Sequence, residues 1–217
     1  MIEKIKKRIL EISYQRKLSH IRSCLTSAPI ILEIMEKKNQ NEPFILSNGH
    51  AALGLYCVNE ALYGIDAQEA WEAHGTHPDH CKEHNLDCST GSLGNGIGIA
   101  LGMALADRER NVYCLVSDAE MAEGSCWEVL RIVQTYAVEN LKIHVNLNGF
   151  GGIGPIDPEE LQTKIMYYTM AGQALGFRPK VYYHRTNVDE YPILKGNEGH
   201  YHILTTNEYE EISRKHH

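Results

Sequence analysis

A carboxylate and a side-chain amide each stand just past an apolar segment that predicts a strand. Asp118 follows residues 112–116, and Asn148 follows residues 142–147. Ligands of open α/β sheets bind beyond the carboxyl ends of parallel strands, so these side chains should share one edge. Their oxygens suit Mg²⁺ or Ca²⁺, which often complete their coordination shell with phosphate and water. The alternative from spacing alone is that Asp118 caps the helix expected after it.

A glycine-rich segment is the second feature that suits an anion. Its sequence, GSLGNG at residues 91–96, leads into an apolar helix expected to end near Asp107. Backbone N–H groups at a glycine-rich helix start bind phosphate. The segment is not a Walker motif, because no Gly-Lys-Ser/Thr follows it. It is not a dinucleotide fingerprint either, because the strand before it is poor.

Histidine and cysteine are concentrated between residues 74 and 88, where four of the twelve histidines fall. Imidazole and thiolate groups bind Zn²⁺ tetrahedrally, so a zinc-binding interaction module is one hypothesis. The spacing matches no common zinc finger and lacks paired Cys-x-x-Cys motifs, which favours polar loop residues instead. The candidate ligands are His74, His77, His80, Cys81, His84 and Cys88.

Strand and helix patterns alternate along the chain, which predicts an α/β fold. Residues 112–147 form a strand, helix and strand, for which a right-handed parallel crossover is expected. We therefore expect one domain over residues 1–217, a parallel sheet with helices on both faces. Strands are expected at 44–46, 112–116, 142–147 and 180–184, and helices at 2–18, 29–38 with Pro29 in the first turn, 51–62, 67–74, 97–107, 121–137, 158–172 and 207–214.

Composition excludes several classes of protein. The 217 residues include 43% hydrophobic and 23% charged residues, which is a globular profile. The formal charge of −7 argues against a nucleic-acid binder. The apolar run at 96–106 is too short to span a bilayer, and six cysteines are too few for a disulfide scaffold. We expect a soluble cytoplasmic protein with reduced thiols, which contacts neither nucleic acid nor membrane.

Small residues repeat every four positions at Gly94, Gly98, Gly102 and Ala106. On a helix they would form one stripe that lets another backbone approach closely. The stripe predicts either helix packing inside the domain or a tight contact with another protein chain.

Together these segments resemble the N-terminal half of transketolase. The matching pieces fall in the family's order with similar gaps, and the step from Asp118 to Asn148 fits the family's thiamine-diphosphate motif. The resemblance covers about residues 5–154. It rests on FILSNGH (44–50), THP (76–78), TGSLG (90–94), SD (117–118), EG (123–124), WE (127–128) and Asn148.

The resemblance implies the thiamine-diphosphate-binding fold and a diphosphate held through Mg²⁺ or Ca²⁺. Asp118 and Asn148 would ligate the metal through their side chains, and Phe150 through its carbonyl. The implied cofactor-binding positions are His50, Gly91, Leu93, Asp118, Ala119, Glu120 and Asn148. The implied catalytic histidines, which match those of the diphosphate and substrate channel, are His20, His50, His77 and His200.

In that family a glutamate from a following pyrimidine-binding domain activates the cofactor, and the chain stops before such a domain. The resemblance therefore implies the N-terminal subunit of a split transketolase. In a heterotetramer with its companion, it would transfer a two-carbon ketol unit from a ketose sugar to an aldehyde.

Three features depart from the family, and one of them is a segment between Gly154 and Val181 that looks shorter than the family's. SDA at 117–119 replaces its Gly-Asp-Gly, which leaves the alternative of a cofactor-free scaffold subunit. A Cβ at Ala119 would be crowded if the backbone there had a positive φ. Arg22 replaces a small residue, and either meets an anionic substrate group or is a surface side chain.

Overall fold

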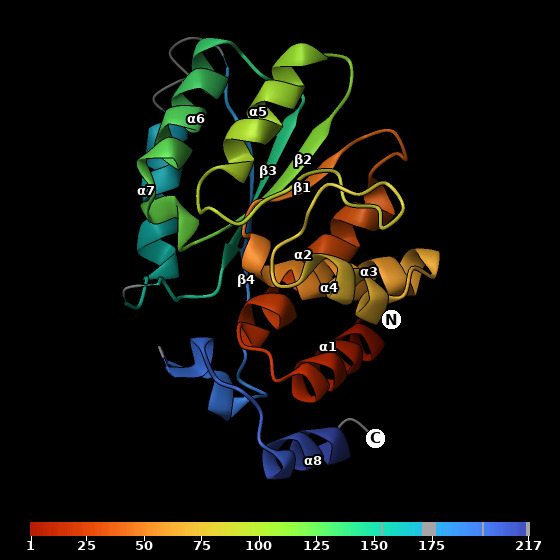
Figure 1. Cartoon of the computed structure of the whole chain (residues 1–217). Helices are drawn as coiled ribbons and strands as arrows, with labels where there is room; N and C mark the ends of the chain where they lie inside the picture. The colour runs from red at the N-terminus through yellow and green to blue at the C-terminus, as the bar shows by residue number, and fades with distance from the viewer. Residues whose placement is uncertain (153, 171–176, 197, 216–217) are drawn as a thin grey trace.

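The protein is described by a computed structural model that covers residues 1–152, 154–170, 177–196 and 198–215. Its centre is a parallel sheet with the strand order β1-β2-β3-β4 (Figure 1). The strands are β1 (Phe44–Leu46), β2 (Val112–Ser117), β3 (Leu141–Leu147) and β4 (Lys180–Arg185). These bounds lie within two residues of those predicted from apolar runs, because buried parallel strands are nearly continuous in apolar residues.

The register brings the carboxyl ends of β2 and β3 to one edge of the sheet. Ser117 pairs with Asn146, and the Asp118 N–H extends the ladder by donating to the Asn146 carbonyl at 3.0 Å. The loops that follow both strands therefore leave the sheet side by side. This places Asp118 and Asn148 at the same edge, as the sequence predicted.

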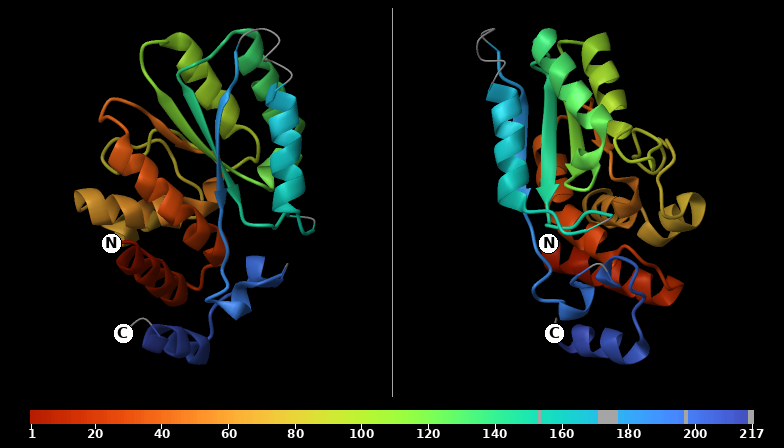
Figure 2. Two further views of the ribbon diagram at one scale, coloured as in Figure 1. Left: turned by 180° about the vertical axis from the view of Figure 1, so that it is seen from behind. Right: turned by 90° about the vertical axis from the view of Figure 1, so that its left-hand side faces the viewer.

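Helices cover both faces of the sheet, which confirms the predicted fold class (Figures 1 and 2). Strand residues such as Ile45, Val116 and Ile143 form one core with the helices between consecutive strands. Strand residues such as Phe44 and Leu115 form the other core with the N-terminal helices. The first face carries α5 (Gly96–Ala106), α6 (Gly124–Thr135) and α7 (Pro158–Met170), and the second carries α1 (Ile2–Arg16), α2 (Ile21–Lys37), α3 (Ala52–Tyr63) and α4 (Ala67–His74).

The predicted start of α2 was wrong. The helix begins at Ile21, eight residues before Pro29, which lies inside the helix instead of in its first turn. A proline within a helix removes one backbone hydrogen bond, and burial of α2 between α1, α3 and the sheet offsets this cost. The polar side chains of residues 22–27 hid the helix, because they are buried toward the sheet edge instead of facing solvent.

Other differences lie at helix ends. The segment predicted as one helix at 121–137 is a 3-10 turn, η2 (Glu120–Ala122), followed by α6. A further 3-10 turn, η1 (Gly49–Ala51), precedes α3. Of the helix predicted at 158–172, residues 171 and 172 lie outside the described residues.

The C-terminal segment returns from β4 to the N-terminal helices (Figure 1). It contains η4 (Pro192–Leu194), η5 (Glu198–His200) and α8 (Thr206–Lys215). Leu194 joins the core of α1 and α2, and the Tyr209 ring stacks on Tyr14 with 4.3 Å between centroids. Because of this return, His200 lies beside His20, and the His20 N–H donates to the His200 carbonyl at 3.0 Å.

No helix within the described ranges is long and apolar enough to cross a membrane.

Candidate functional site

A cavity of about 190 Å³ opens where the loops after β2 and β3 leave the sheet. Its wall comes from parts of the chain that lie far apart in sequence. Nearly every site residue predicted from the sequence lines it. The lining residues are His20, Arg22, Ser23, His50, His77, Gly91, Leu93, Ser117, Asp118, Ala119, Asn148, Phe150, Gly152, His200 and Tyr201.

Asp118 contributes a carboxylate that is only 1% exposed. Its oxygens accept the backbone N–H groups of Ala119 at 3.0 Å and Gly149 at 2.7 Å. Burial raises the pKa of Asp118 to about 6, although these backbone donors act in the opposite direction. Asp118 caps neither helix that follows, because η2 starts after Ala119 and α6 after Glu123. The helix-cap alternative is therefore wrong, and the carboxylate instead holds the Asn148 loop.

The loop after β3 brings an amide and an aromatic ring to the cavity. The Asn148 Oδ1 atom accepts the Phe150 N–H at 3.1 Å, which fixes the turn. Gly149 between them has a φ of 84°, a conformation that side chains disfavour. The loop then folds back, and Phe150 pairs with Pro155 in an isolated bridge.

Arg22 is not the surface side chain that one alternative expected. It is 2% exposed, and its Nη1 atom donates to the carbonyls of Leu194 at 3.1 Å and Gly196 at 2.8 Å. Its guanidinium lies over the Phe150 ring, 3.8 Å from the centroid. Burial lowers the pKa of Arg22, and the charge of Asp118 raises it. A fixed cation thus lies within the cavity wall.

The glycine-rich segment at residues 91–96 forms part of the cavity wall. Gly94 has a φ of 77°, and a Cβ there would lie 2.4 Å from the Ser125 Oγ atom. A Cβ on Gly96 would lie 2.6 Å from the Ser47 Cα atom. Both positions therefore require glycine, and the segment presents Gly91 and Leu93 to the cavity.

Glu120 does not line the cavity, although the resemblance implied that it binds cofactor. Its carboxylate is fully buried and accepts the Ser47 hydroxyl at 2.6 Å, the Gly94 N–H at 2.9 Å and the Ser117 N–H at 3.1 Å. The side chain thus fixes the segments that form the cavity. Ala119 does line it and has a φ of −59°, so its Cβ causes no backbone strain.

Three predicted histidines form a cluster on one wall of the cavity. The ring centroid of His20 lies 5.4 Å from that of His50 and 4.6 Å from that of His200. Burial is the main cause that lowers the pKa of His50 to about 3 and that of His200 to about 4. Neighbouring imidazoles contribute to both shifts, and the Arg22 charge contributes to that of His200. The Ser19 hydroxyl bonds to the Nδ1 atom of His20 at 2.8 Å. These rings are therefore neutral near pH 7, and each can donate one hydrogen bond and accept another.

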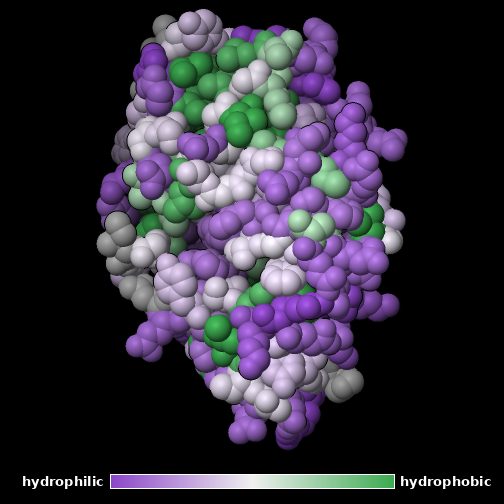
Figure 3. Space-filling model, viewed as in Figure 1, coloured by the Kyte–Doolittle hydropathy of each residue, from purple (hydrophilic) through white to green (hydrophobic). Residues whose placement is uncertain are grey.

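The predicted small-residue stripe is only partly a helix face. Gly94 lies before α5, and Gly98, Gly102 and Ala106 lie on its exposed side. A Cβ on Gly98 or Gly102 would contact nothing within 4 Å, so packing inside the described chain does not explain them. Ile99 is 39% exposed and Leu105 38% exposed on the same helix. Figure 3 shows apolar side chains gathered over this upper part of the molecule.

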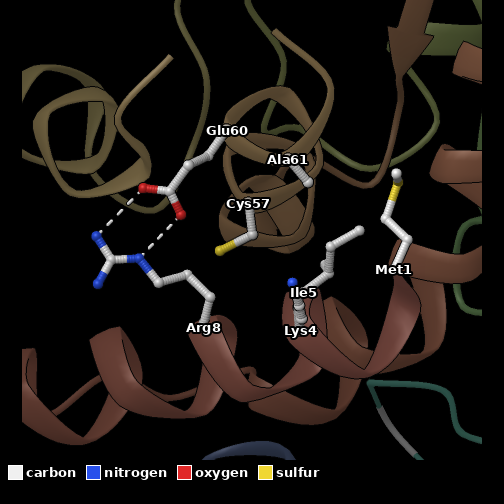
Figure 4. A pocket seen from close by; sticks show the side chains of 7 residues that line it. All are labelled: Met1, Lys4, Ile5, Arg8, Cys57, Glu60 and Ala61. Carbon is white, nitrogen blue, oxygen red and sulfur yellow. Dashed lines mark hydrogen bonds and ion pairs between the residues drawn. The ribbon is translucent and has the colours of Figure 1, made fainter. Parts of the chain in front are cut away.

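A larger hollow of about 370 Å³ lies between α1 and α3 (Figure 4). Two of its charged groups pair with each other, because the Arg8 guanidinium donates to both carboxylate oxygens of Glu60 at 2.9 and 3.3 Å. None of its lining residues belongs to the strand ends. Size alone therefore does not identify the functional site, and the strand-end cavity carries the groups suited to chemistry.

Comparison with known proteins identifies the class of this domain. A family model described as the thiamine diphosphate binding domain of transketolase matches residues 32–151, more than half of the chain. The domain is therefore a thiamine-diphosphate-binding domain. The chain belongs to the transketolase family.

Curated relatives extend this similarity beyond the family model. Human transketolase is 34% identical over 73% of this chain and 28% of its own length. One subunit of the apulose-4-phosphate transketolase of Phocaeicola vulgatus is 30% identical, over 67% of this chain and 59% of its own length. The chain thus matches little more than a quarter of the human enzyme and over half of the bacterial subunit.

Solved structures show the same fold at low sequence identity. A transketolase variant from Pichia stipitis superposes with a TM-score of 0.80 over 99% of this chain and 40% of its own, at 17% identity. Transketolase from Leishmania mexicana gives a TM-score of 0.73 over 100% and 41%, at 20% identity. The likeness includes the C-terminal segment that the family model does not reach.

Proposed function

We propose that residues 1–217 form one diphosphate-binding domain that acts as the N-terminal subunit of a two-component transketolase-like transferase. The observation that carries the proposal is the shared cavity, where Asp118 and Asn148 meet the histidine cluster. The Phocaeicola vulgatus relative, which is itself one subunit of a transketolase, supports a two-component arrangement, since this chain matches over half of its length.

The donor set of the cavity fits a divalent cation. Asp118 is a buried carboxylate with a raised pKa, and a cation beside it would offset the cost of its burial. The oxygens of Asp118, Asn148 and the Phe150 carbonyl would hold Mg²⁺ or Ca²⁺, the ions that prefer oxygen ligands. Gly91 and Leu93 would meet the cofactor, and the Arg22 guanidinium would meet its diphosphate or an anionic group of the substrate.

When bound, thiamine diphosphate would supply the carbanion chemistry of ketol transfer, in which a two-carbon unit passes from a ketose to an aldehyde. The chain's own residues would orient the sugar and move its protons. His20, His50 and His200 are neutral near pH 7, so they can donate hydrogen bonds to the substrate hydroxyls or accept hydrogen bonds from them. His77 lies beside Gly91 on the cavity wall and would bind the sugar from that side.

The companion would supply the group that this cavity lacks. No glutamate lines the cavity among the residues that the structure describes. The cofactor-activating glutamate of the family would therefore come from a companion chain with a pyrimidine-binding domain. The exposed side of α5, together with Leu93, offers an apolar surface for a heterotetrameric contact.

The test compares this chain, a co-expressed companion and their mixture for ketol transfer between sugars. We expect no turnover from either chain alone and full turnover from the mixture. The matched control is a mixture with Asp118→Ala, which should assemble by light scattering but stay inactive. Activity of this chain alone would refute the two-component arrangement, and an assembled mixture that binds no thiamine diphosphate would favour the scaffold alternative.

A further inference from the structure

A second cluster of chemically active side chains lies outside the cavity, at the end of α4. The last residue of that helix, His74, directs its Nε2 atom at the Nδ1 atom of His84, 2.7 Å away. The Cys81 thiol joins them, and the three potential ligand atoms all lie within 4.8 Å of one another. His77, His80 and Cys88, which the sequence offered as further ligands, are not members of this cluster.

The backbone around the cluster is held by several bonds. Cys81 and Leu86 exchange both backbone hydrogen bonds, at 2.9 and 2.8 Å, and so close a tight turn that contains His84. The buried Asn59 amide donates to the His84 carbonyl at 3.0 Å. The Tyr56 hydroxyl donates to the Gly75 carbonyl at 3.3 Å, next to His74. Cys81 and His84 are therefore presented by a fixed turn.

Small side-chain rotations would bring the three ligand atoms to the spacing of a tetrahedral zinc site. With bonds of about 2.0–2.1 Å to nitrogen and 2.3 Å to sulfur, tetrahedral ligand atoms lie about 3.3–3.6 Å apart. The two ring nitrogens would separate by about 0.6 Å from their hydrogen-bonded distance, which rotation of partly exposed side chains allows. An ion would also replace the single proton that the two facing nitrogens share.

The ligand types of the cluster suit a transition-metal ion. The Cys81 thiol donates to the Glu83 carboxylate at 3.3 Å, which is the direction in which its proton would leave. Two imidazoles and a thiolate suit Zn²⁺ better than Mg²⁺ or Ca²⁺, which prefer oxygen.

We propose that His74, Cys81 and His84 bind one Zn²⁺ ion per chain, with water as the fourth ligand. The ion would cross-link the end of α4 to the turn at residues 81–86. Residues 75–91 connect these points to the cavity and carry His77 and Gly91. The site would therefore fix the segment that forms one side of the cavity, and its existence does not depend on the proposed activity.

The test uses the full chain, stripped of metal by a chelator and titrated with Zn²⁺ and with Co²⁺ as a spectroscopic probe. One equivalent of Co²⁺ should give the strong visible bands of tetrahedral coordination and a thiolate charge-transfer band. Cys81→Ser should remove the thiolate band, and Cys81→Ser or His84→Ala should weaken Zn²⁺ binding by more than about 100-fold. Stoichiometric Zn²⁺ should raise the Tm of the parent.

Matched controls lie in the same segment. Cys88→Ser and His80→Ala remove a thiol and an imidazole outside the cluster, and should keep the spectrum and the affinity of the parent. The chain with His74→Ala, Cys81→Ser and His84→Ala measures binding elsewhere, including at the terminal histidines. Equal Zn²⁺ affinity of that chain and the parent, or bound Co²⁺ without a thiolate band, would overturn the proposal.

Discussion

The Ser47 hydroxyl donates to the Glu120 carboxylate across 2.6 Å and joins the end of β1 to the turn after β2. The same carboxylate accepts backbone N–H groups from Gly94 and Ser117. Three segments that form the cavity thus meet at one buried side chain. Burial raises the pKa of Glu120, and the Ser47 hydroxyl and the two N–H groups lower it.

Removal of this carboxylate should destabilise the chain. Glu120→Ala leaves three buried donors without an acceptor, at about 1–3 kcal/mol each before relaxation. We expect a loss of about 2–5 kcal/mol in the free energy of unfolding, measured with urea. Glu123→Ala, an exposed carboxylate of the same turn, should stay within about 0.5 kcal/mol of the parent. Equal stability of the two variants would contradict this role of Glu120.

Asp118 should be essential for metal-dependent cofactor binding. Asp118→Ala removes the charged ligand proposed for the cation and the acceptor of the Gly149 N–H. We expect Mg²⁺-dependent affinity for thiamine diphosphate to fall by more than about 100-fold, measured by calorimetry on the assembled complex. Asp189→Ala, which removes an exposed carboxylate paired with Lys195, is the control. Unchanged affinity in Asp118→Ala would exclude Asp118 as a ligand.

The histidine cluster should make stability depend on pH. The pKa of His50 is lowered from 6.5 to about 3, so the unfolded chain binds a proton there that the folded chain rejects. The contribution of His50 to the free energy of unfolding is therefore fully present above pH 6.5, and it is lost as the pH falls toward 3. Between about pH 7 and pH 5 this loss is about 2 kcal/mol for one histidine.

His50→Gln removes this titration, so the parent should lose about 2 kcal/mol more than the variant between about pH 7 and pH 5. Urea unfolding of both chains at each pH gives the difference, in which the remaining titratable groups largely cancel. A difference that does not vary with pH would show that His50 is accessible to protons in the folded chain.

The exposed side of α5 should contact the companion chain. Gly98→Leu places a side chain where nothing lies within 4 Å, so the isolated chain should keep its stability. Its free energy of unfolding should even rise by up to about 1 kcal/mol, because leucine has a higher helix propensity than glycine. Assembly with the companion should fail, because the added side chain meets a closely packed partner. Lys7→Leu, on the exposed side of α1, should assemble like the parent.

Light scattering and thiamine diphosphate titration would follow both variants in mixture with the companion. Because α5 follows the segment that presents Gly91 and Leu93, loss of assembly and loss of cofactor affinity should occur together. Normal assembly of the Gly98→Leu chain would show that this helix face is free.

The sequence by itself determined the sheet and the main groups of the cavity. Buried parallel strands are short apolar runs, so β1, β2 and β3 were located within about one residue. Asp118 and Asn148 followed from the rule that strand ends meet at one edge. The order of the motifs was sufficient to identify the family and its thiamine-diphosphate-binding domain. These motifs lie on consecutive helices, strands and loops, so their order can be read directly from the sequence.

The tertiary structure alone decided how several other polar residues are used. Arg22 and the polar residues at 23–27 gave no apolar periodicity, because their partners are buried groups from distant segments, such as the Leu194 carbonyl. His200 reaches His20 only through the return of the C-terminal segment. Likewise, the gathering of His74, Cys81 and His84 depends on a turn closed by backbone bonds. Hydrogen bonds between distant segments leave no periodic trace in a sequence, so they become visible only when the chain is folded.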